Sequence, residues 1–135
     1  MELKPGIVGK QSVMVTEAMT AQKLGSGELP VLATPQMIAL MENTAYKSVA
    51  AYLGEGQGTV GTRIAVNHLA ATPVGMEVSL ESELVEIDRK RLVFTVKAYD
   101  ASGCIGEGEH ERFIIDNQRF LEKAEAKRKE IKGDS

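Results

Sequence analysis

The spacing of apolar residues changes once along this chain, and that change constrains the fold more than any other feature of the sequence. From Met37 to Leu53, apolar residues recur every three or four positions, which is the period of a helix. From Val60 to Ile115 they alternate with polar residues, which is typical of strands with one buried face. This order predicts one long helix followed by an antiparallel sheet.

The long helix has a predicted start and end. Thr34 is a favourable N-cap residue, and Pro35 follows at the first helical position. Gly54 and Gly56 end the pattern. Small and apolar residues also lie on the other faces, so we expect the rest of the fold to cover this helix on most sides. Residues 19–30 contain several breakers and are expected to form a loop.

The remaining pattern predicts strands and one further helix. A weak alternation at residues 12–15 indicates a first strand. Four more are expected at residues 60–68, 78–84, 92–98 and 105–115. Short turns join the last three as hairpins. A charged surface helix that frays at its end is expected from Asn117 onward.

These elements predict an α+β fold in a single domain over residues 1–135. Its economical packing is one long central helix wrapped by a curved antiparallel sheet of about five strands, with a C-terminal helix added. Such a sheet leaves its edges and one face poorly covered, which favours dimerisation.

Composition argues against several classes of function. The net charge of −3 disfavours a nucleic-acid partner, because phosphate binding needs concentrated Lys and Arg. Cys104 is the only cysteine, so no intrachain disulfide or multi-cysteine metal site is expected. The N-terminus lacks the apolar segment of a signal peptide, and no apolar run approaches membrane-spanning length. We therefore expect a cytoplasmic protein that binds no membrane and carries no cofactor or metal.

The segment Gly56–Gly61 matches the glycine pattern of dinucleotide-binding loops, but its context is wrong. That motif must follow a strand and open a helix, whereas here it follows a helix and opens a strand. We interpret Gly56 and Gly58 as a flexible turn. Gly61 lies inside the strand pattern, where a glycine marks either a bulge or the close approach of a ligand or another backbone.

Glu42 lies on the same predicted helix face as Ile38, Ala45 and Val49. Burying an ionised carboxylate is costly unless it is paired or hydrogen-bonded. Carboxylates in such positions often serve as acids or bases. A position at the rim of the face, or a structural hydrogen bond to a loop, is an equally open interpretation.

Thr34 and His68 each allow a structural and a functional interpretation. His68 lies at a strand end, on the face of Ile64 and Val66, where it is either a satisfied core group or a base. Thr34 is most simply a cap. A residue at a helix N-terminus also lies in positive potential, which suits an oxygen that gains negative charge in a reaction.

Several further side chains allow a structural interpretation. Arg112 shares a strand face with His110, and it is either a surface charge or a group that holds a carboxylate or phosphate. The two histidines lack metal-ligand spacing. Cys104 is expected to be a small core residue rather than a nucleophile. Residues 127–129 are expected to form a solvated basic face of the last helix, with phosphate binding as the weaker interpretation.

Three segments of the chain resemble the hotdog-fold thioesterases, and most closely the fluoroacetyl-CoA thioesterase family. They are "VLATPQMIALMEN", "GTVGTRIAVNHLAATPVG" and "IGEGEHERFIID". Family members carry a Thr before the central helix, a Glu eight residues on, a His after the following strand and an Arg in the last strand. The matching positions here are Thr34, Glu42, His68 and Arg112, and Gly61 matches the strand glycine that lines the acyl site.

The resemblance implies hydrolysis of a short acyl-CoA thioester to free acid and CoA. It also implies a homodimer, or a larger assembly of dimers, with the sites at the dimer interface. Thr34 and Glu42 would activate water or form a covalent acyl intermediate, and His68 would serve as the base. Gly61 would contact the acyl end, and Arg112 would support the site.

The chain departs from the family in the loop before the helix. Fluoroacetyl-specific members close the pocket there with phenylalanines, whereas "AQKLGSGELP" contains no aromatic residue. Asn43 also stands where a large aromatic would match. We therefore do not predict fluorine selectivity. A hotdog dehydratase or hydratase, and a non-catalytic acyl-CoA-binding protein, are the alternative functions, and the Thr34–Glu42–His68 spacing favours the thioesterase.

Overall fold

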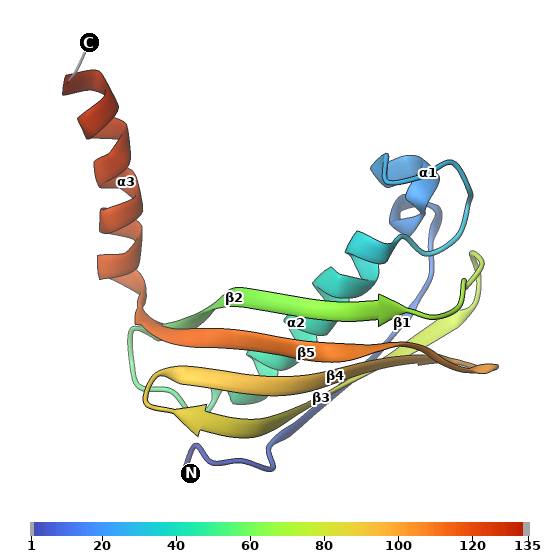
Figure 1. Cartoon of the computed structure of the whole chain (residues 1–135), viewed down its shortest axis with the longest axis horizontal. Helices are drawn as coiled ribbons and strands as arrows, with labels where there is room; N and C mark the ends of the chain where they lie inside the picture. Colours follow the sequence, from blue (N-terminus) through green and yellow to red (C-terminus); the bar gives the residue numbers. More distant parts are fainter. Residues whose placement is uncertain (1, 134–135) are drawn as a thin grey trace.

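The computed structural model describes the backbone of residues 2–133 and the side chains of residues 2–130. Its elements are, in order, β1 (Val8–Met14), the 3-10 helix η1 (Glu17–Met19), α1 (Ala21–Leu24), α2 (Thr34–Ala50), β2 (Gln57–His68), β3 (Glu77–Asp88), β4 (Arg91–Asp100), β5 (Gly103–Asp116) and α3 (Asn117–Gly133). Helix α2 lies across one face of the sheet, and α3 projects from one end of it (Figure 1). The predicted α+β architecture is confirmed.

The five strands form one antiparallel sheet in the order β1-β3-β4-β5-β2. Tight turns join β3 to β4 and β4 to β5, as the turn-rich segments predicted. The chain crosses from β1 to the opposite edge of the sheet through α2. Strands β1 and β2 are therefore the two edges of the sheet, and β2 carries the candidate residues Gly61 and His68.

The core lies between α2 and the concave face of the sheet. Met37, Met41, Ala45 and Val49 are fully buried and recur every four residues, so they form one stripe along the helix. Alternate residues of β3 and β4 face this stripe, as the period-two pattern predicted. These residues are Val78, Leu80, Leu84, Leu92, Phe94, Val96 and Ala98.

Strand β1 crosses α2 at very short range, and Gly9 permits the crossing. A Cβ atom at Gly9 would lie 2.8 Å from both the Thr44 carbonyl oxygen and the Ser48 Cβ. Two residues on, the amide of Gln11 donates to the Thr44 hydroxyl over 2.7 Å. Close packing and this hydrogen bond fix α2 against the edge of the sheet.

Several predicted boundaries are wrong by a few residues. Strand β1 begins at Val8 rather than at Ser12. Helix α2 ends at Ala50, before the glycines, because the next N–H groups bond carbonyls three residues back and tighten the last turn. The predicted loop contains the short helix α1, which Thr20 caps through its side chain.

A bulge changes the facing of residues in β2. The register against β5 shifts next to Gly61, which pairs with Arg112, while Ile64 pairs with His110. Opposed residues lie on the same face, so Gly61 and Ile64 both face α2. The predicted alternation, which put residues 60 and 62 on the face of Ile64, is wrong because the bulge inserts one extra residue.

Cys104 is exposed, so its expected place in the core is wrong. Its neighbour Ile105 is buried instead. The register of β5 against β4 shifts at this point, since Ala98 pairs with Gly106 and Tyr99 with Cys104, and this bulge turns Cys104 away from the core.

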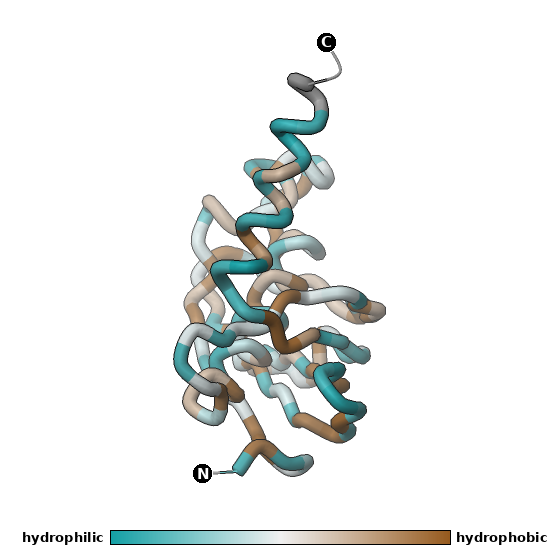
Figure 2. The backbone as a smooth tube through the Cα atoms, turned by 90° about the vertical axis from the view of Figure 1, so that its left-hand side faces the viewer, coloured by the Kyte–Doolittle hydropathy of each residue, from teal (hydrophilic) through white to brown (hydrophobic). Residues whose placement is uncertain are grey.

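The predicted C-terminal helix is confirmed as α3, and hydrophilic residues dominate its length (Figure 2). The expected fraying at its end concerns residues 134–135, which lie outside the described residues. Within residues 2–133, no helix is long and apolar enough to cross a membrane.

Candidate active site

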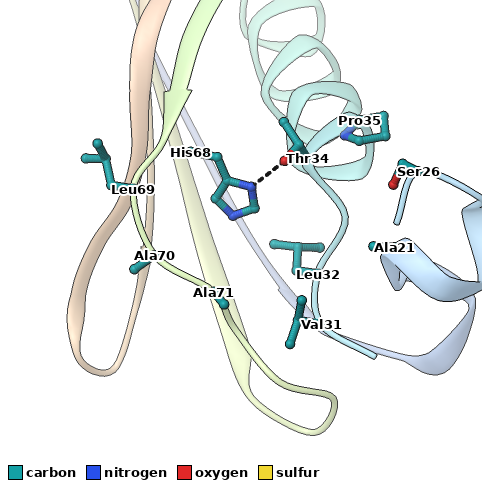
Figure 3. A pocket seen from close by; sticks show the side chains of 10 residues that line it. All are labelled: Ala21, Ser26, Val31, Leu32, Thr34, Pro35, His68, Leu69, Ala70 and Ala71. Carbon is teal, nitrogen blue, oxygen red and sulfur yellow. Dashed lines mark hydrogen bonds between the residues drawn. The ribbon is translucent and has the colours of Figure 1, made fainter. Parts of the chain in front are cut away.

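The first cluster of candidate residues joins the start of α2 to the end of β2. The Thr34 hydroxyl oxygen lies 2.8 Å from Nδ1 of His68 (Figure 3). The prediction that Thr34 is the N-cap is wrong, because Thr34 is the first residue of the helix. Ala33 takes the cap position because its carbonyl accepts the first helical bond, from the N–H of Met37. The Thr34 hydroxyl contacts Nδ1 of His68 instead.

A cavity of about 390 Å³ opens beside this pair. One wall comes from α1 and the segment that leads into α2, and the other from the residues after β2 (Figure 3). Small and apolar side chains make up most of the lining, with Ala21, Ala70 and Ala71 among them. The volume lies in the range of small-molecule sites, which are about 300–1,000 Å³.

The environment of His68 favours a neutral imidazole. Burial lowers its pKa from the ordinary value of 6.5, and the backbone of Ala70 acts more weakly in the opposite direction. Its Nε2 has no hydrogen-bond partner among the described residues. With an unprotonated Nδ1, the imidazole accepts the hydrogen bond of the Thr34 hydroxyl, which is the arrangement of a nucleophile and its base.

The second cluster lies at the middle of α2, where the helix faces β2 and β5. Arg112 is 7% exposed, and its Nη1 lies 4.0 Å from Oε2 of Glu42. The same guanidinium donates to the hydroxyl of Thr59 over 2.8 Å and to the Thr59 carbonyl over 2.9 Å. Its plane also lies over Tyr46, with 5.7 Å from Cζ to the ring centroid. Arg112 is therefore not a surface charge, and it faces a carboxylate.

Glu42 lies at the rim of the helix face rather than within it. Its side chain is 40% exposed in the single chain. Met41, which precedes it, and Ala45, one turn further along the helix, are fully buried. Its carboxylate points toward Gly61, where a Cβ atom would lie 2.9 Å from Oε2.

The interpretation of Gly61 as a bulge is confirmed, and the groups that approach it closely are side chains of the same chain. The bulge in β2 lies at this residue, and the missing side chain leaves room for the second cluster. An added Cβ would lie 3.2 Å from Nη1 of Arg112 and 2.9 Å from the carboxylate of Glu42. Any side chain here would occupy the space between these two charged groups.

The comparisons with known proteins agree on one family. Residues 15–118 match the family described as fluoroacetyl-CoA-specific thioesterase. The chain belongs to this family of thioesterases. Over 97 residues the chain is 41% identical to the fluoroacetyl-CoA thioesterase of Streptantibioticus cattleyicolor. The matched stretch covers 72% of this chain and 70% of that protein.

Solved structures of thioesterases share its hotdog fold. A structure of the fluoroacetyl-CoA thioesterase superposes with a TM-score of 0.88 at 34% identity, covering 94% of this chain and 98% of the other. A thioesterase superfamily member from Thermus thermophilus superposes with a TM-score of 0.87 at 28% identity, covering 98% and 97%. The predicted hotdog fold and the predicted enzyme class, an acyl-CoA thioesterase, are confirmed.

In this thioesterase chain the five predicted site residues form two groups rather than one. Thr34 pairs with His68, and Glu42 lies with Gly61 and Arg112. No hydrogen bond or ion pair joins the groups within residues 2–130. Thr34 and Glu42 are eight residues apart on one helix, which corresponds to about 12 Å along its axis.

Sequence reasoning missed Thr59 as a partner of Arg112. The predicted alternation put residue 60 on the face toward α2 and hence Thr59 on the other face, whereas the bulge next to Gly61 turns Thr59 toward α2. The role of His110 was signalled by the face it shares with Arg112, and the structure places the two in contact at 3.1 Å. In the part of the chain that the structure describes, no group of three or more His, Cys, Asp or Glu side chains could hold a metal ion.

Proposed function

We propose that this thioesterase hydrolyses a small acyl-CoA thioester to the free acid and CoA, with Thr34 and His68 as the nucleophile and its base. The observation that carries the proposal is the 2.8 Å contact between the Thr34 hydroxyl and His68 Nδ1 at the edge of the cavity. The lowered pKa of His68 supports it, because a base must be unprotonated at working pH.

The reaction proceeds in two steps on this geometry. The Thr34 oxygen attacks the thioester carbonyl while its proton moves to Nδ1 of His68. The carbon–sulfur bond then breaks, and His68 returns the proton to the sulfur of CoA. Water hydrolyses the resulting ester on Thr34 and releases the acid. Negative charge on the carbonyl oxygen is stabilised at the start of α2, where the first N–H groups of the helix lack intrahelical acceptors.

Glu42 joins the site from a second copy of the chain in this proposal. Strand β2 is an edge of the sheet, and an exposed edge strand presents unpaired backbone groups to another strand. A two-fold axis near the middle of β2 would pair it with its own copy in antiparallel fashion. The half of one strand that carries Gly61 would then approach the half of the other that ends at His68. The homodimer, or a larger assembly of such dimers, thereby brings the two clusters together.

The assignment of the acyl group follows from the cavity. Its walls are mostly small and apolar, which suits an uncharged acyl chain better than a charged one. The segment before α2 contributes Ala21 and Ser26 and no aromatic side chain. We therefore leave fluoroacetyl selectivity out of the proposal. A single-domain cytoplasmic enzyme, as expected from the sequence, is part of it.

Free-thiol release from a panel of acyl-CoAs tests this function. The panel runs from acetyl through branched and long-chain to aromatic groups, with Thr34→Ala and Thr34→Ser assayed alongside. We expect one acyl class to be preferred, Thr34→Ser to retain activity and Thr34→Ala to lose it. Hydration of an enoyl-CoA without thiol release would identify a hydratase instead. Binding of acyl-CoA by a folded dimer with no turnover would identify a binding protein.

A further inference from the structure

His110 lies behind Arg112 in the core, and the chemistry above does not use it. The side chain is 1% exposed. Its Nδ1 lies 2.8 Å from the Arg63 carbonyl oxygen on β2, and its Nε2 lies 3.1 Å from Nη1 of Arg112. The imidazole therefore lies between a backbone carbonyl of β2 and the guanidinium of Arg112, which is on the same strand, β5, as His110.

Only one form of the imidazole can make both contacts. A carbonyl oxygen only accepts, so Nδ1 must carry a hydrogen and donate it to Arg63. A guanidinium only donates, so Nε2 must be unprotonated and accept from Arg112. The doubly protonated ring would set two donors against each other at Nε2. The two contacts are thus consistent only with a neutral ring protonated at Nδ1.

The surroundings of His110 hold the ring in this neutral form. Burial lowers its pKa from 6.5, and the charge of Arg112 lowers it further. The hydrogen bond to the Arg63 carbonyl and the charges of Glu42 and Glu111 act in the opposite direction. On β4, the group beside it is the uncharged Phe94 ring, with 6.1 Å between the centroids.

The contact from His110 completes the fixation of Arg112. Thr59 holds Nε and Nη2 on one side of the guanidinium, and His110 holds Nη1 on the other. Nη1 is also the atom nearest Glu42, at 4.0 Å. Loss of the acceptor at His110 would leave this end of the guanidinium free to turn.

We propose that His110 is a positioning residue that acts through Arg112. Its neutral imidazole fixes the guanidinium edge that faces Glu42 and Gly61. The proposal rests on the proposed function in one respect, namely that Arg112 and Glu42 serve thioester hydrolysis.

A pair of substitutions separates the two contacts of the ring. The amide of Gln reaches the position of Nε2 and keeps an acceptor for Arg112, whereas the shorter amide of Asn reaches the position of Nδ1 and keeps a donor for Arg63. We expect His110→Gln to retain most of kcat. We expect His110→Asn to lose roughly 10- to 100-fold in kcat with little change in KM, because the guanidinium is misplaced. In an Arg112→Lys background, His110→Asn should cause little further loss, because the group through which His110 acts has already been replaced.

Equal kcat values for the Gln and Asn variants, or additive losses in the double variant, would overturn the proposal. ¹⁵N NMR of the imidazole in the unmodified protein tests it without any turnover assay. We expect Nδ1 protonated and Nε2 unprotonated above pH 6.5, and a ring with a proton on Nε2 in that range would also overturn it. This readout still decides the matter if the variants do not fold. Absence of thiol release by the unmodified protein would defeat the proposed function and leave the NMR result standing.

Discussion

The two ends of the candidate site are built in opposite ways. Thr34 and His68 form a neutral hydrogen-bonded pair at the edge of a cavity, with Thr34 exposed and His68 half-buried. Arg112 and Glu42 form a charged pair, in which a buried guanidinium faces a half-exposed carboxylate. The first pair lines an open cavity, whereas the second is enclosed by contacts from Thr59 and His110.

This difference indicates a division of labour. A nucleophile and base must meet the substrate, so they lie at an opening and keep few other contacts. A buried charge must be surrounded by hydrogen-bond partners, because burying it alone is costly. In the proposed mechanism the reactive pair lies at one end of α2 and the electrostatic pair at its middle.

The largest effect is expected at the neutral pair. Replacing His68 by Ala removes the base, so we expect kcat to fall by roughly 10²- to 10⁴-fold. His68 is half-buried at a strand end, so the folded state should survive. Steady-state thiol release and a thermal melt check both points. A variant that fails to fold would instead make His68 a core residue.

Glu42→Gln tests the charged pair and is expected to have the next largest effect. The substitution keeps the shape of the side chain and removes its charge, so we expect turnover to fall by about 10²-fold when this preorganised charge is lost. The side chain is 40% exposed, and the melting temperature should change little. Unchanged turnover would remove Glu42 from the mechanism.

Gly61→Ala should disturb the charged pair without removing any of its groups. The added Cβ would lie 2.9 Å from the Glu42 carboxylate, which must move away. We expect a loss of roughly 10-fold in kcat, because a displacement of less than an ångström misplaces a group less than its removal does. In a Glu42→Gln background the same substitution should cost little more. Additive losses would show that Gly61 acts elsewhere.

The smallest predicted effect is on the pH profile. Burial lowers the pKa of His68, so the folded protein keeps the neutral base below the ordinary value of 6.5. The acid limb of kcat/KM should therefore have its midpoint below pH 6.5. Because the unfolded chain binds this proton more readily, stability should also decrease as pH falls from about 6.5 toward the folded pKa. A midpoint above 6.5 would show that His68 is not the titrating base.

The sequence predicted the fold because its periods are strong and local. The helix from Thr34 and the buried faces of β3 and β4 follow from period 3.6 and period 2 over many residues. The glycine at position 61 allowed a bulge without requiring one, because a strand glycine equally suits a close approach of another group. The cap at Ala33 escaped prediction because its backbone carbonyl, rather than a favourable side chain, begins the helix.

The candidate residues were identified by motif, but their grouping was not predictable from it. Spacing along the chain placed Thr34, Glu42 and His68 in one pattern, whereas the folded chain separates Glu42 from the other two. The pairing of His68 with Thr34 depends on how the end of β2 meets the start of α2. That relation is tertiary and has no local signal.

A heterodimer of two inactive variants tests most directly whether two chains build the site together. His68→Ala and Glu42→Gln chains, carrying different affinity tags, are co-expressed and purified through both tags in turn. If His68 acts with Glu42 of the partner subunit, one of the two sites in this dimer holds both unmodified residues. The account then predicts about half the turnover of the unmodified dimer. Turnover no higher than that of the two variant homodimers would show that each site lies within one chain, and would contradict it.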